Sequence, residues 1–281
     1  MIVSDVDGTL TRSDGIISES TIEAIDRVTN DGCLFVIATA RPFDDAMPIA
    51  TSFRSTSAIV CQNGALTYNP HGSRNWVRMS LPVELSREIV SRVREAAPGA
   101  SIALDYFDQR YASPGWRLSD PSWSGPWRKG ANSHRLSIFQ LEAAHMPSLT
   151  CMCILVTGAA TADLKHLEAE LPITVTSSAS GLIEISARRA TKGNAVKKLL
   201  RSMELRNVSV VAFGDMDNDV DLLRDATVGV AIGRESSALA GVADIVAPSS
   251  DEDGVAWTLN EMQAADRENP WRFVAPSDSE G

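Results

Sequence analysis

The N-terminal stretch constrains the fold of this chain more than any other. The run 1–4 is β-prone, and Asp5, Asp7 and Gly8 follow it directly. Side chains at the end of such a strand can splay into the crevice beyond its carboxyl edge, where open α/β sheets bind ligands. Two carboxylates so close repel each other unless one is protonated or a cation lies between them. The stretch therefore predicts either an Mg²⁺ site, since Mg²⁺ often uses one or two carboxylates plus phosphate, or an ordinary Asp-Gly turn.

Apolar runs further along the chain predict a parallel sheet. Continuous apolar runs are typical of parallel strands that are covered on both faces, and they span 33–38, 58–61 and 208–213. A capping box at 20–23 predicts a helix between the first strand and the second. A strand–helix–strand unit of this kind implies a right-handed crossover and parallel strands. The fold class is therefore α/β.

Polar residues follow two of these runs. Thr39, Ala40 and Arg41 end the run 33–38, where a hydroxyl and neighbouring backbone N–H groups can hold a phosphate oxygen. Asn63 follows the run 58–61, although Asn-Gly between β-prone runs also signals a hairpin. Each position can thus be read as a phosphate or substrate contact or as a simple turn.

The C-terminal half offers a lysine and a second acidic cluster. Lys192 opens a predicted helix, where the helix dipole disfavours a cation unless an acid or a phosphate compensates. Asp215, Asn218 and Asp219 follow the run 208–213 and form an oxygen-rich group suited to Mg²⁺. The other interpretation of Lys192 is a solvated side chain.

The spacing of these residues locates an inserted domain. Only 32 positions separate Asp7 from Thr39, whereas 153 separate Thr39 from Lys192. The insertion therefore falls in the second interval, and its mixed pattern predicts an α+β cap domain. Its predicted helices span 84–96 and 161–171, and its predicted strands lie near 101–105, 134–139, 151–156 and 173–177. The predicted organisation is a core of 1–79 and 186–265, a cap of 80–185 and a flexible tail of 266–281.

Within the cap, the stretch 106–133 lacks clear periodicity and is predicted to be a long loop. Arg110, Arg117, Trp123 and Arg128 lie in it, and basic residues among aromatics suit an anionic ligand. Long irregular loops in compact domains are often functional, so these residues are candidates for substrate specificity. The competing interpretation is a surface loop that its aromatics hold against the cap.

Composition narrows the class of partner. The net charge of −10 and the pI of about 4.9 argue against a nucleic-acid binder. No apolar run reaches the length of a membrane span, and no basic segment followed by an apolar run opens the chain. The four cysteines lie mostly in apolar runs and suit buried, reduced thiols. We therefore expect a cytoplasmic protein, monomeric or homodimeric, with a small-molecule partner.

Taken together, the motifs resemble those of the haloacid dehalogenase superfamily of phosphohydrolases. The sequence Asp-Val-Asp-Gly-Thr-Leu at 5–10 resembles its first motif, Thr39 its second, Lys192-Gly193 its third, and Gly-Asp-x-x-Asn-Asp at 214–219 its fourth. The Asn-Gly-Ala triplet at 63–65 and the place of the insertion resemble the Cof-like, sugar-phosphatase type subfamily. That subfamily usually has Thr-Gly-Arg where this chain has Ala40. The resemblance implies a Rossmann-like parallel sheet core with an inserted α+β cap.

The resemblance also implies a mechanism. Asp5 is the expected nucleophile, which forms an aspartyl phosphate, and Asp7 the general acid and base. Lys192 and Thr39 are expected to stabilise the phosphoryl oxygens, and Asn218 to contact phosphate or the network around it. Mg²⁺ is expected at Asp5, the Asp7 carbonyl, Asp215 and Asp219.

The expected substrate is a small phosphate ester such as a sugar phosphate. Two other functions remain open. One is a phosphomutase or phosphotransferase that passes the phosphoryl group to a sugar. The other is a non-catalytic phosphate-binding regulator, which predicts the loss of Asp5 or Asp7, although both are present.

Overall fold

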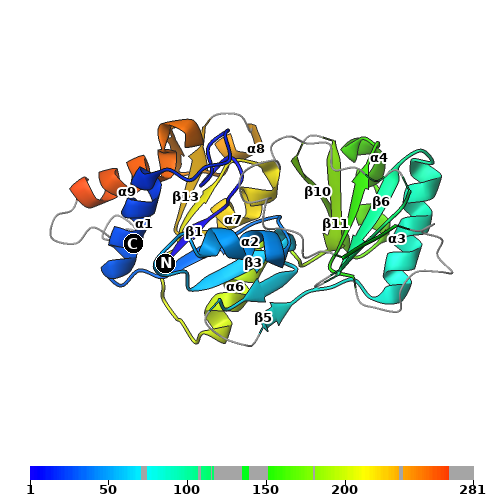
Figure 1. Ribbon diagram of the computed structural model, residues 1–281, viewed down its shortest axis with the longest axis horizontal. Coiled ribbons are helices and arrows are strands. Elements are labelled where there is room, and N and C mark those ends of the chain that lie inside the picture. The colour runs from blue at the N-terminus through cyan, green and yellow to red at the C-terminus, as the bar shows by residue number, and fades with distance from the viewer. Residues whose placement is uncertain are drawn as a thin grey trace, which may run out of the picture.

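The computed structural model describes residues 1–70, 75–106, 109–114, 116, 135–138, 151–179, 181–233 and 237–265. Its strands form two separate sheets, each with helices packed against it (Figure 1). One sheet is built from both ends of the chain and the other from the middle. None of the helices in these ranges is both long and apolar enough to cross a membrane.

The first sheet has eight strands in the order β14-β13-β12-β1-β2-β3-β4-β5. The bounds are β1 (Ile2–Ser4), β2 (Phe35–Ala38), β3 (Ala58–Cys61), β4 (Leu66–Tyr68), β5 (Asn75–Arg78), β12 (Val211–Gly214), β13 (Val228–Ile232) and β14 (Ile245–Ala247). All neighbours from β14 to β3 are parallel, and β3, β4 and β5 are antiparallel. The α/β core expected from the apolar runs is confirmed, and so is the hairpin expected at the Asn-Gly pair.

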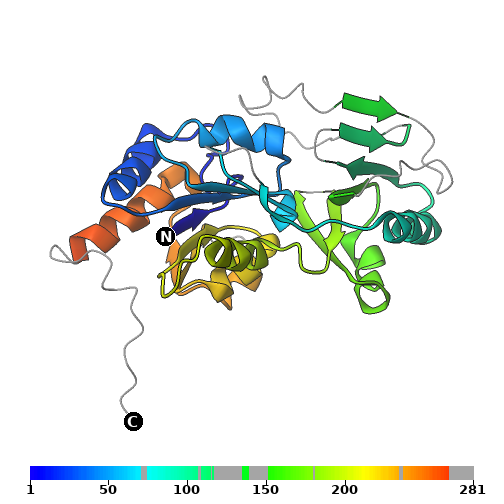
Figure 2. The same ribbon diagram turned by 90° about the horizontal axis from the view of Figure 1, so that it is seen from below.

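Helices cover both faces of this sheet. They are α1 (Glu19–Asn30), α2 (Phe43–Ala50), α6 (Lys192–Ser202), α7 (Val220–Asp225), α8 (Ser237–Ala240) and α9 (Gly254–Ala265). Helix α1 turns Ile25 and Val28 into the core, and Ser18 caps it by accepting from the Thr21 backbone N–H. Figure 2 views the sheet nearly edge-on and shows α1 on one face and α6 on the other. The carboxyl ends of the parallel strands face the second sheet, and residues of the loops that follow them share a cavity with it.

Several elements of the core differ from the expectations, and β2 begins at Phe35 rather than at the start of the run 33–38. The strand predicted over 208–213 begins only at Val211, because Val211 pairs with Ile2 and β1 offers no partner before that residue. The sequence analysis does not predict strand β5 or helix α2. In α2 the helical pattern is weak, because the helix is short and contains Pro48.

In the part of the chain that the structure describes, the second sheet has six strands in the order β10-β11-β9-β6-β7-β8. The bounds are β6 (Ser101–Asp105), β7 (Gln109–Ala112), β8 (Arg135–Ile138), β9 (Cys153–Thr157), β10 (Ile173–Ala179) and β11 (Leu182–Ala187). Its helices are α3 (Val83–Ala96), α4 (Thr161–Lys165) and α5 (Leu167–Glu170), so the helix predicted over 161–171 is two short ones. The prediction of a loop over 106–133 is wrong for Gln109–Ala112, which form strand β7. The polar sequence of β7 does not indicate a strand, and the strand is stabilised by its pairing with β6.

The two faces of the second sheet differ in chemistry. One face is apolar and packs against α3, α4 and α5 through residues such as Ile102, Val156 and Ile183. The other carries a small cluster that includes Ala103 and Leu155. Asp105, Arg110 and Glu184 from this second face line a small cavity together with Ala40, Pro42 and Gln62 of the first sheet's loops. The second face is therefore turned toward the carboxyl edge of the parallel strands.

Candidate active site

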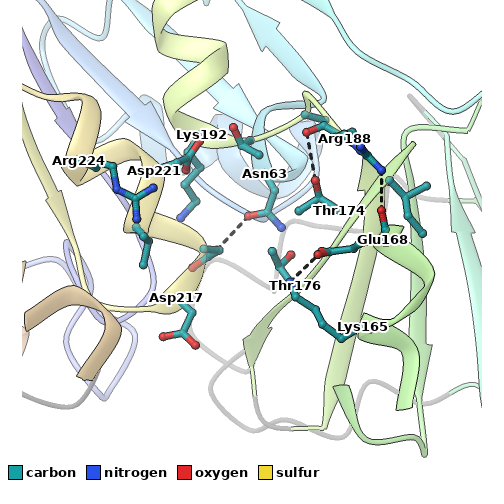
Figure 3. Close-up of a pocket in the computed structure, with 15 residues that line it drawn as sticks. Asn63, Lys165, Glu168, Thr174, Thr176, Arg188, Lys192, Asp217, Asp221 and Arg224 are labelled. Carbon is teal, nitrogen blue, oxygen red and sulfur yellow. Dashed lines mark hydrogen bonds and ion pairs between the residues drawn. The ribbon is translucent and has the colours of Figure 1, made fainter. Parts of the chain in front are cut away.

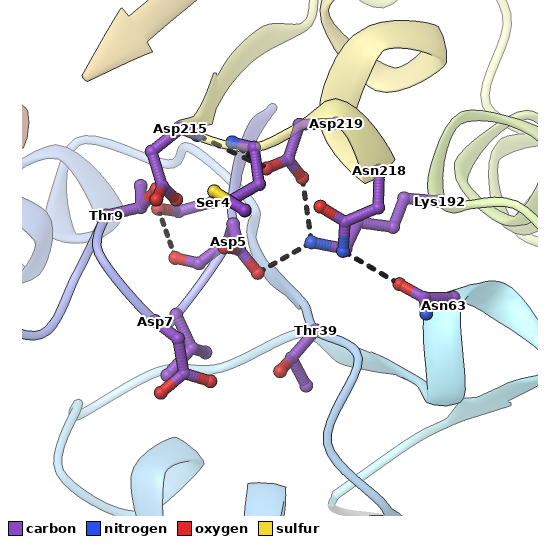
Figure 4. A network of polar contacts seen from close by, with 12 residues as sticks. Ser4, Asp5, Asp7, Thr9, Thr39, Asn63, Lys192, Asp215, Asn218 and Asp219 are labelled. Carbon is purple, nitrogen blue, oxygen red and sulfur yellow. Dashed lines mark hydrogen bonds and ion pairs between the residues drawn. The ribbon is translucent and has the colours of Figure 1, made fainter. Parts of the chain in front are cut away.

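Four strand ends and one helix start meet at the carboxyl edge of the parallel sheet (Figure 4). Asp5 follows β1, Thr39 follows β2, Asn63 follows β3 and Asp215 follows β12. Lys192 is the first residue of α6. Because parallel strands end at the same edge, residues far apart in sequence become neighbours here.

Lys192 is the electrostatic centre of the site. Its side chain is completely buried, and its Nζ donates to Asp5 Oδ1 and to Asp219 Oδ1, each at 2.7 Å. Burial alone would lower the pKa of Lys192, but the charges of Asp219 and Asp5 and their hydrogen bonds raise it. The acidic partners expected for a lysine in the first helical turn are thus present.

Asp5, Asp215 and Asp219 bring carboxylate oxygens within 4.8 Å of one another. Burial is the main reason why the pKa of Asp5 is raised, and the neighbouring carboxylates add to it while Lys192 opposes it. Burial, followed by the charge of Asp219, raises the pKa of Asp215 to about 7. Oxygen donors that repel each other in this way are suited to a hard divalent cation, which would relieve the repulsion.

The loop after β1 fits closely around Asp215. Gly8 has a φ of +79°, and a Cβ at this position would lie 2.3 Å from Asp215 Oδ2. Glycine is therefore required both by the backbone conformation and by the space. The hydroxyl of Thr9 donates to Asp215 Oδ1 at 2.7 Å, which fixes the orientation of the carboxylate.

Asp7 lies apart from the three clustered carboxylates and forms an ion pair with Arg41. The Nε of Arg41 donates to Asp7 Oδ2 at 2.8 Å, and Nη2 contacts Oδ1. Burial would lower the pKa of Arg41, but the hydrogen bond and charge of Asp7 raise it. Nothing in the spacing of the two residues predicted this pair, because it depends on how the turns after β1 and β2 meet.

The remaining predicted core residues surround the same space. The hydroxyl of Thr39, which is fully buried, accepts from the Arg41 backbone N–H at 3.0 Å. The Nδ2 of Asn218 donates to Asn63 Oδ1 at 2.9 Å. Ala40 lines the small cavity against the second sheet. Figure 4 shows the hydrogen bonds of Lys192 with Asp5 and Asp219, and the separate hydrogen bond between Asn218 and Asn63.

Of the four predicted specificity residues in the cap, one lies within the described residues. Arg110, on β7, is paired with Asp105 on β6 through two hydrogen bonds, of 2.5 and 2.7 Å. It faces the cavity that Ala40 also lines. Arg117, Trp123 and Arg128 lie outside the described residues.

A family model described as haloacid dehalogenase-like hydrolase matches residues 2–259. The chain belongs to this family. The resemblance inferred from the four motifs is thereby confirmed, and the family model extends over both sheets.

Two curated proteins that resemble this haloacid dehalogenase-like hydrolase over most of its length are named phosphatases. The 5-amino-6-(5-phospho-D-ribitylamino)uracil phosphatase of Bacillus subtilis (strain 168) is 25% identical over 93% of this chain and 96% of its own length. The pyridoxal phosphate phosphatase of Escherichia coli (strain K12) is 23% identical over 91% of this chain and 96% of its own. The prediction that the chain is an enzyme of the phosphatase kind is confirmed.

Solved structures confirm the fold of this haloacid dehalogenase-like hydrolase. A haloacid dehalogenase-like hydrolase from B. subtilis has a TM-score of 0.79 at 24% identity, with 92% of this chain and 98% of that chain covered. A sugar phosphatase of HAD subclass IIB has a TM-score of 0.77 at 18% identity, with 92% and 97% covered. The predicted Rossmann-like α/β fold is confirmed, and the second sheet with its helices lies in the segment where the sequence predicts an inserted α+β cap.

Sequence reasoning missed Asp221, which supports the start of α6. Its carboxylate lies beside Gly193, where a Cβ would be 2.9 Å from Asp221 Oδ2. Burial raises the pKa of Asp221, while Thr191 and the Gly193 backbone lower it. A Cβ at Gly193 would lie 2.7 Å from the Asp221 backbone oxygen, so α6 and α7 touch at this point. Asp221 thus holds the helix turn that presents Lys192. It falls two residues beyond the fourth motif, where no pattern singled it out.

Proposed function

We propose that the chain is an Mg²⁺-dependent phosphomonoesterase that acts on a small phosphorylated metabolite, a sugar phosphate or similar, through an aspartyl-phosphate intermediate. The observation that carries this proposal is the buried Lys192, held 2.7 Å from both Asp5 and Asp219 beside the carboxylate of Asp215. A lysine and several carboxylates gathered at one strand edge suit the transfer of a charged phosphoryl group.

In the first step, a carboxylate oxygen of Asp5 attacks phosphorus, and the bond from phosphorus to the ester oxygen breaks. Asp7 donates its proton to the leaving alcohol oxygen. In the second step, Asp7 takes a proton from water as the water oxygen attacks phosphorus. The bond between phosphorus and Asp5 then breaks, which releases inorganic phosphate and restores the Asp5 carboxylate and the protonated Asp7.

The neighbours of these two residues support each step. Arg41 holds both oxygens of Asp7 and so fixes where its carboxyl group points. Lys192 is placed to offset the charge of the equatorial phosphoryl oxygens, with Thr39 as a further hydrogen-bond donor. In the absence of substrate, the positive charge of Lys192 offsets the negative charges of Asp5 and Asp219 instead.

Mg²⁺ would be held by Asp5, Asp215 and Asp219, together with the backbone carbonyl of Asp7. Among the described residues these three carboxylates form a cluster of oxygen donors, which fits a hard cation. When bound, Mg²⁺ supplies positive charge that neutralises the carboxylates and the transferring phosphoryl group. Asp219 also accepts from the backbone N–H groups of Asp215 and Met216, each at 3.2 Å, so it shapes the loop as well.

The nature of the substrate rests on two lines of support. The two relatives above are named for small phosphorylated molecules, a ribitylaminouracil phosphate and pyridoxal phosphate. The net charge of −10 disfavours a nucleic acid as the partner. We therefore propose a small-molecule phosphate ester, no nucleic-acid or membrane partner, a cytoplasmic location and a monomer or homodimer.

The test is a panel of phosphate esters with the purified protein and Mg²⁺, including p-nitrophenyl phosphate. Release of inorganic phosphate supports a phosphatase. A sugar phosphate that is isomerised without free phosphate would point to a phosphomutase or phosphotransferase. If no ester reacts while phosphate still binds, the chain is a non-catalytic binding protein and the proposal fails.

A further inference from the structure

Asn63 and Asn218 form a pair of amides that keeps two hydrogen-bonding atoms unused. Both side chains are more than nine-tenths buried, at 4% and 8% exposed. One hydrogen bond joins them, while Asn63 Nδ2 and Asn218 Oδ1 have no partner among the described residues. If both amides were turned over, the same bond would form in reverse. One donor and one acceptor would again remain, so this property does not depend on the assignment of the amides.

The backbone that presents Asn63 is strained. Gln62 and Asn63 have φ values of +49° and +52°, a region that non-glycine residues rarely adopt, and Gly64 follows at +98°. A Cβ at Gly64 would lie 2.3 Å from the Thr191 backbone oxygen, so the turn presses against the residue before Lys192. Strain of this kind persists where the surrounding structure enforces it, often at functional sites. Here the hairpin turn between β3 and β4 also places Asn63 opposite Asn218.

A cavity of about 560 Å³ opens beside this pair (Figure 3). Asn63, Asn218 and Lys192 line it from the core, and Thr174 and Thr176 line it from β10 of the cap. Figure 3 shows the Asn63 side chain between Lys192 and the two threonines. Lys192 is one of the residues that line the cavity, and its Nζ donates to the predicted nucleophile Asp5, so the cavity lies next to the proposed phosphate site. Its volume is in the range of small-molecule sites.

Thr176 adds a third unused atom to this cavity. Its Oγ1 is buried and has no hydrogen-bond partner among the residues that the structure describes. Buried polar groups are nearly always hydrogen-bonded, so three such atoms around one cavity point to a missing ligand group. The group must accept from an N–H and donate to a carbonyl oxygen. A carboxylate or phosphate only accepts and an ammonium only donates, whereas a hydroxyl does both.

We propose that Asn63, Asn218 and Thr176 bind a hydroxyl group of the leaving alcohol and thereby select phosphate esters of polyhydroxylated chains over deoxy analogues. This inference rests on the proposed phosphatase function. It assigns part of the specificity to an amide pair of the core and to strand β10, outside the loop 106–133. Sites built to hydrogen-bond a hydroxyl reject analogues that lack it, because their polar atoms are then left unpaired.

The experiment compares D-glucitol 6-phosphate with n-hexyl phosphate, which has the same carbon chain without the hydroxyls. We would measure kcat/KM on both for the native protein, Thr176→Val and Asn63→Gly; glycine tolerates the left-handed backbone at 63. Thr67→Val is the matched control, because Thr67 Oγ1 is also buried without a partner among the described residues but does not line the cavity. We expect the native protein to prefer the glucitol ester at least tenfold. We also expect Thr176→Val and Asn63→Gly each to lower that preference about tenfold, and Thr67→Val to leave it unchanged.

The inference is overturned if Thr176→Val and Asn63→Gly keep the native preference, since the unused atoms would then be satisfied by ordered water only. It is also overturned if Thr67→Val lowers the preference as much as Thr176→Val does. If no ester is hydrolysed at all, the proposed function fails separately. In that case the dissociation constants of the same two ligands are measured by calorimetry on the same variants. The ratio of the two constants replaces the ratio of kcat/KM values, with the same expected changes.

Discussion

Buried charges lie on both sides of the space between the two sheets, but they are neutralised in different ways. In the core, Lys192 reaches Asp5 across 187 positions of sequence and Asp219 across 27. In the cap, Arg110 pairs with Asp105, five positions away and directly opposite on the neighbouring strand. The core thus brings together charges from distant segments, whereas the cap pairs charges within one hairpin.

This difference separates two kinds of role. The core holds three carboxylates around one lysine, and the negative charge that remains favours a cation. The cap pair matches one positive with one negative charge, and the buried carboxylate of Glu184 lines the same small cavity. Buried charges that need an outside partner mark a reactive site more strongly than buried charges that satisfy each other. The comparison therefore favours the core as the chemical centre and makes the role of Arg110 a question for experiment.

The largest expected effect is the loss of turnover in Asp5→Asn. An amide cannot replace the attacking carboxylate, so kcat for phosphate release should fall by about 10⁴-fold or more. Asp14→Asn is the control, because Asp14 lies exposed in the same N-terminal loop and should leave kcat unchanged. Steady-state hydrolysis by Asp5→Asn above the level of a contaminant would remove Asp5 from the role of nucleophile.

Removal of divalent cations should have a comparable effect. We expect no activity in excess chelator, full recovery with Mg²⁺, and inhibition by Ca²⁺, which prefers more ligands and looser geometry. Because Mg²⁺ would bind only the folded chain, it should also stabilise the protein by about 2.7 kcal/mol at 100 times its dissociation constant. Activity assays and thermal unfolding with and without Mg²⁺ check both expectations. Equal rates with Ca²⁺ and Mg²⁺ would argue against the proposed Mg²⁺ site.

Lys192→Met should lower stability even where activity is not measured. The change leaves Asp5 and Asp219 buried without their cation, and breaking a buried pair in this way costs about 3–5 kcal/mol. Lys197→Met on the same helix is the matched control. Lys197 pairs with Asp225 at 2.8 Å, but its side chain is 48% exposed, so its loss should cost about 0–1 kcal/mol. Denaturant unfolding with chelator present measures the free energy of unfolding of both variants. Equal losses of stability would show that the ion pairs of Lys192 matter no more than the exposed ion pair of Lys197.

The smallest and most selective effect is expected in the cap. Arg110→Ala alone would leave Asp105 buried without its partner, so a loss of folding could be mistaken for a loss of specificity. The double change Asp105→Leu and Arg110→Met removes both charges and should be tolerated better. If Arg110 helps to choose the substrate, kcat/KM should fall about tenfold on the best ester and less on p-nitrophenyl phosphate. An equal change of kcat/KM on both substrates would show that Arg110 does not determine specificity. Other cap residues or the core would then choose the substrate.

Much of the core site follows from local sequence. Apolar runs fix where buried strands lie, and parallel strands must bring their carboxyl ends to one edge, so Asp5, Thr39, Asn63 and Asp215 could be predicted to converge. Spacing also placed the insertion between Thr39 and Lys192, because 32 positions hold only a turn and a helix. Each of these inferences needs only the periodicity of nearby residues and the geometry of one sheet.

The tertiary structure alone decided which side chains satisfy one another. The pair of Arg41 with Asp7, the packing of Asp221 against Gly193 in α6, and the amide pair of Asn63 with Asn218 join residues whose sequence patterns are unrelated. The sequence did not predict strand β7 either. Its residues Gln109–Ala112 are stabilised as a strand by pairing with β6, and their own sequence pattern does not indicate one. Sequence periodicity reports which face of an element is buried. The partner of each buried polar atom depends on the relative positions of whole elements, and these are set by packing across the entire fold.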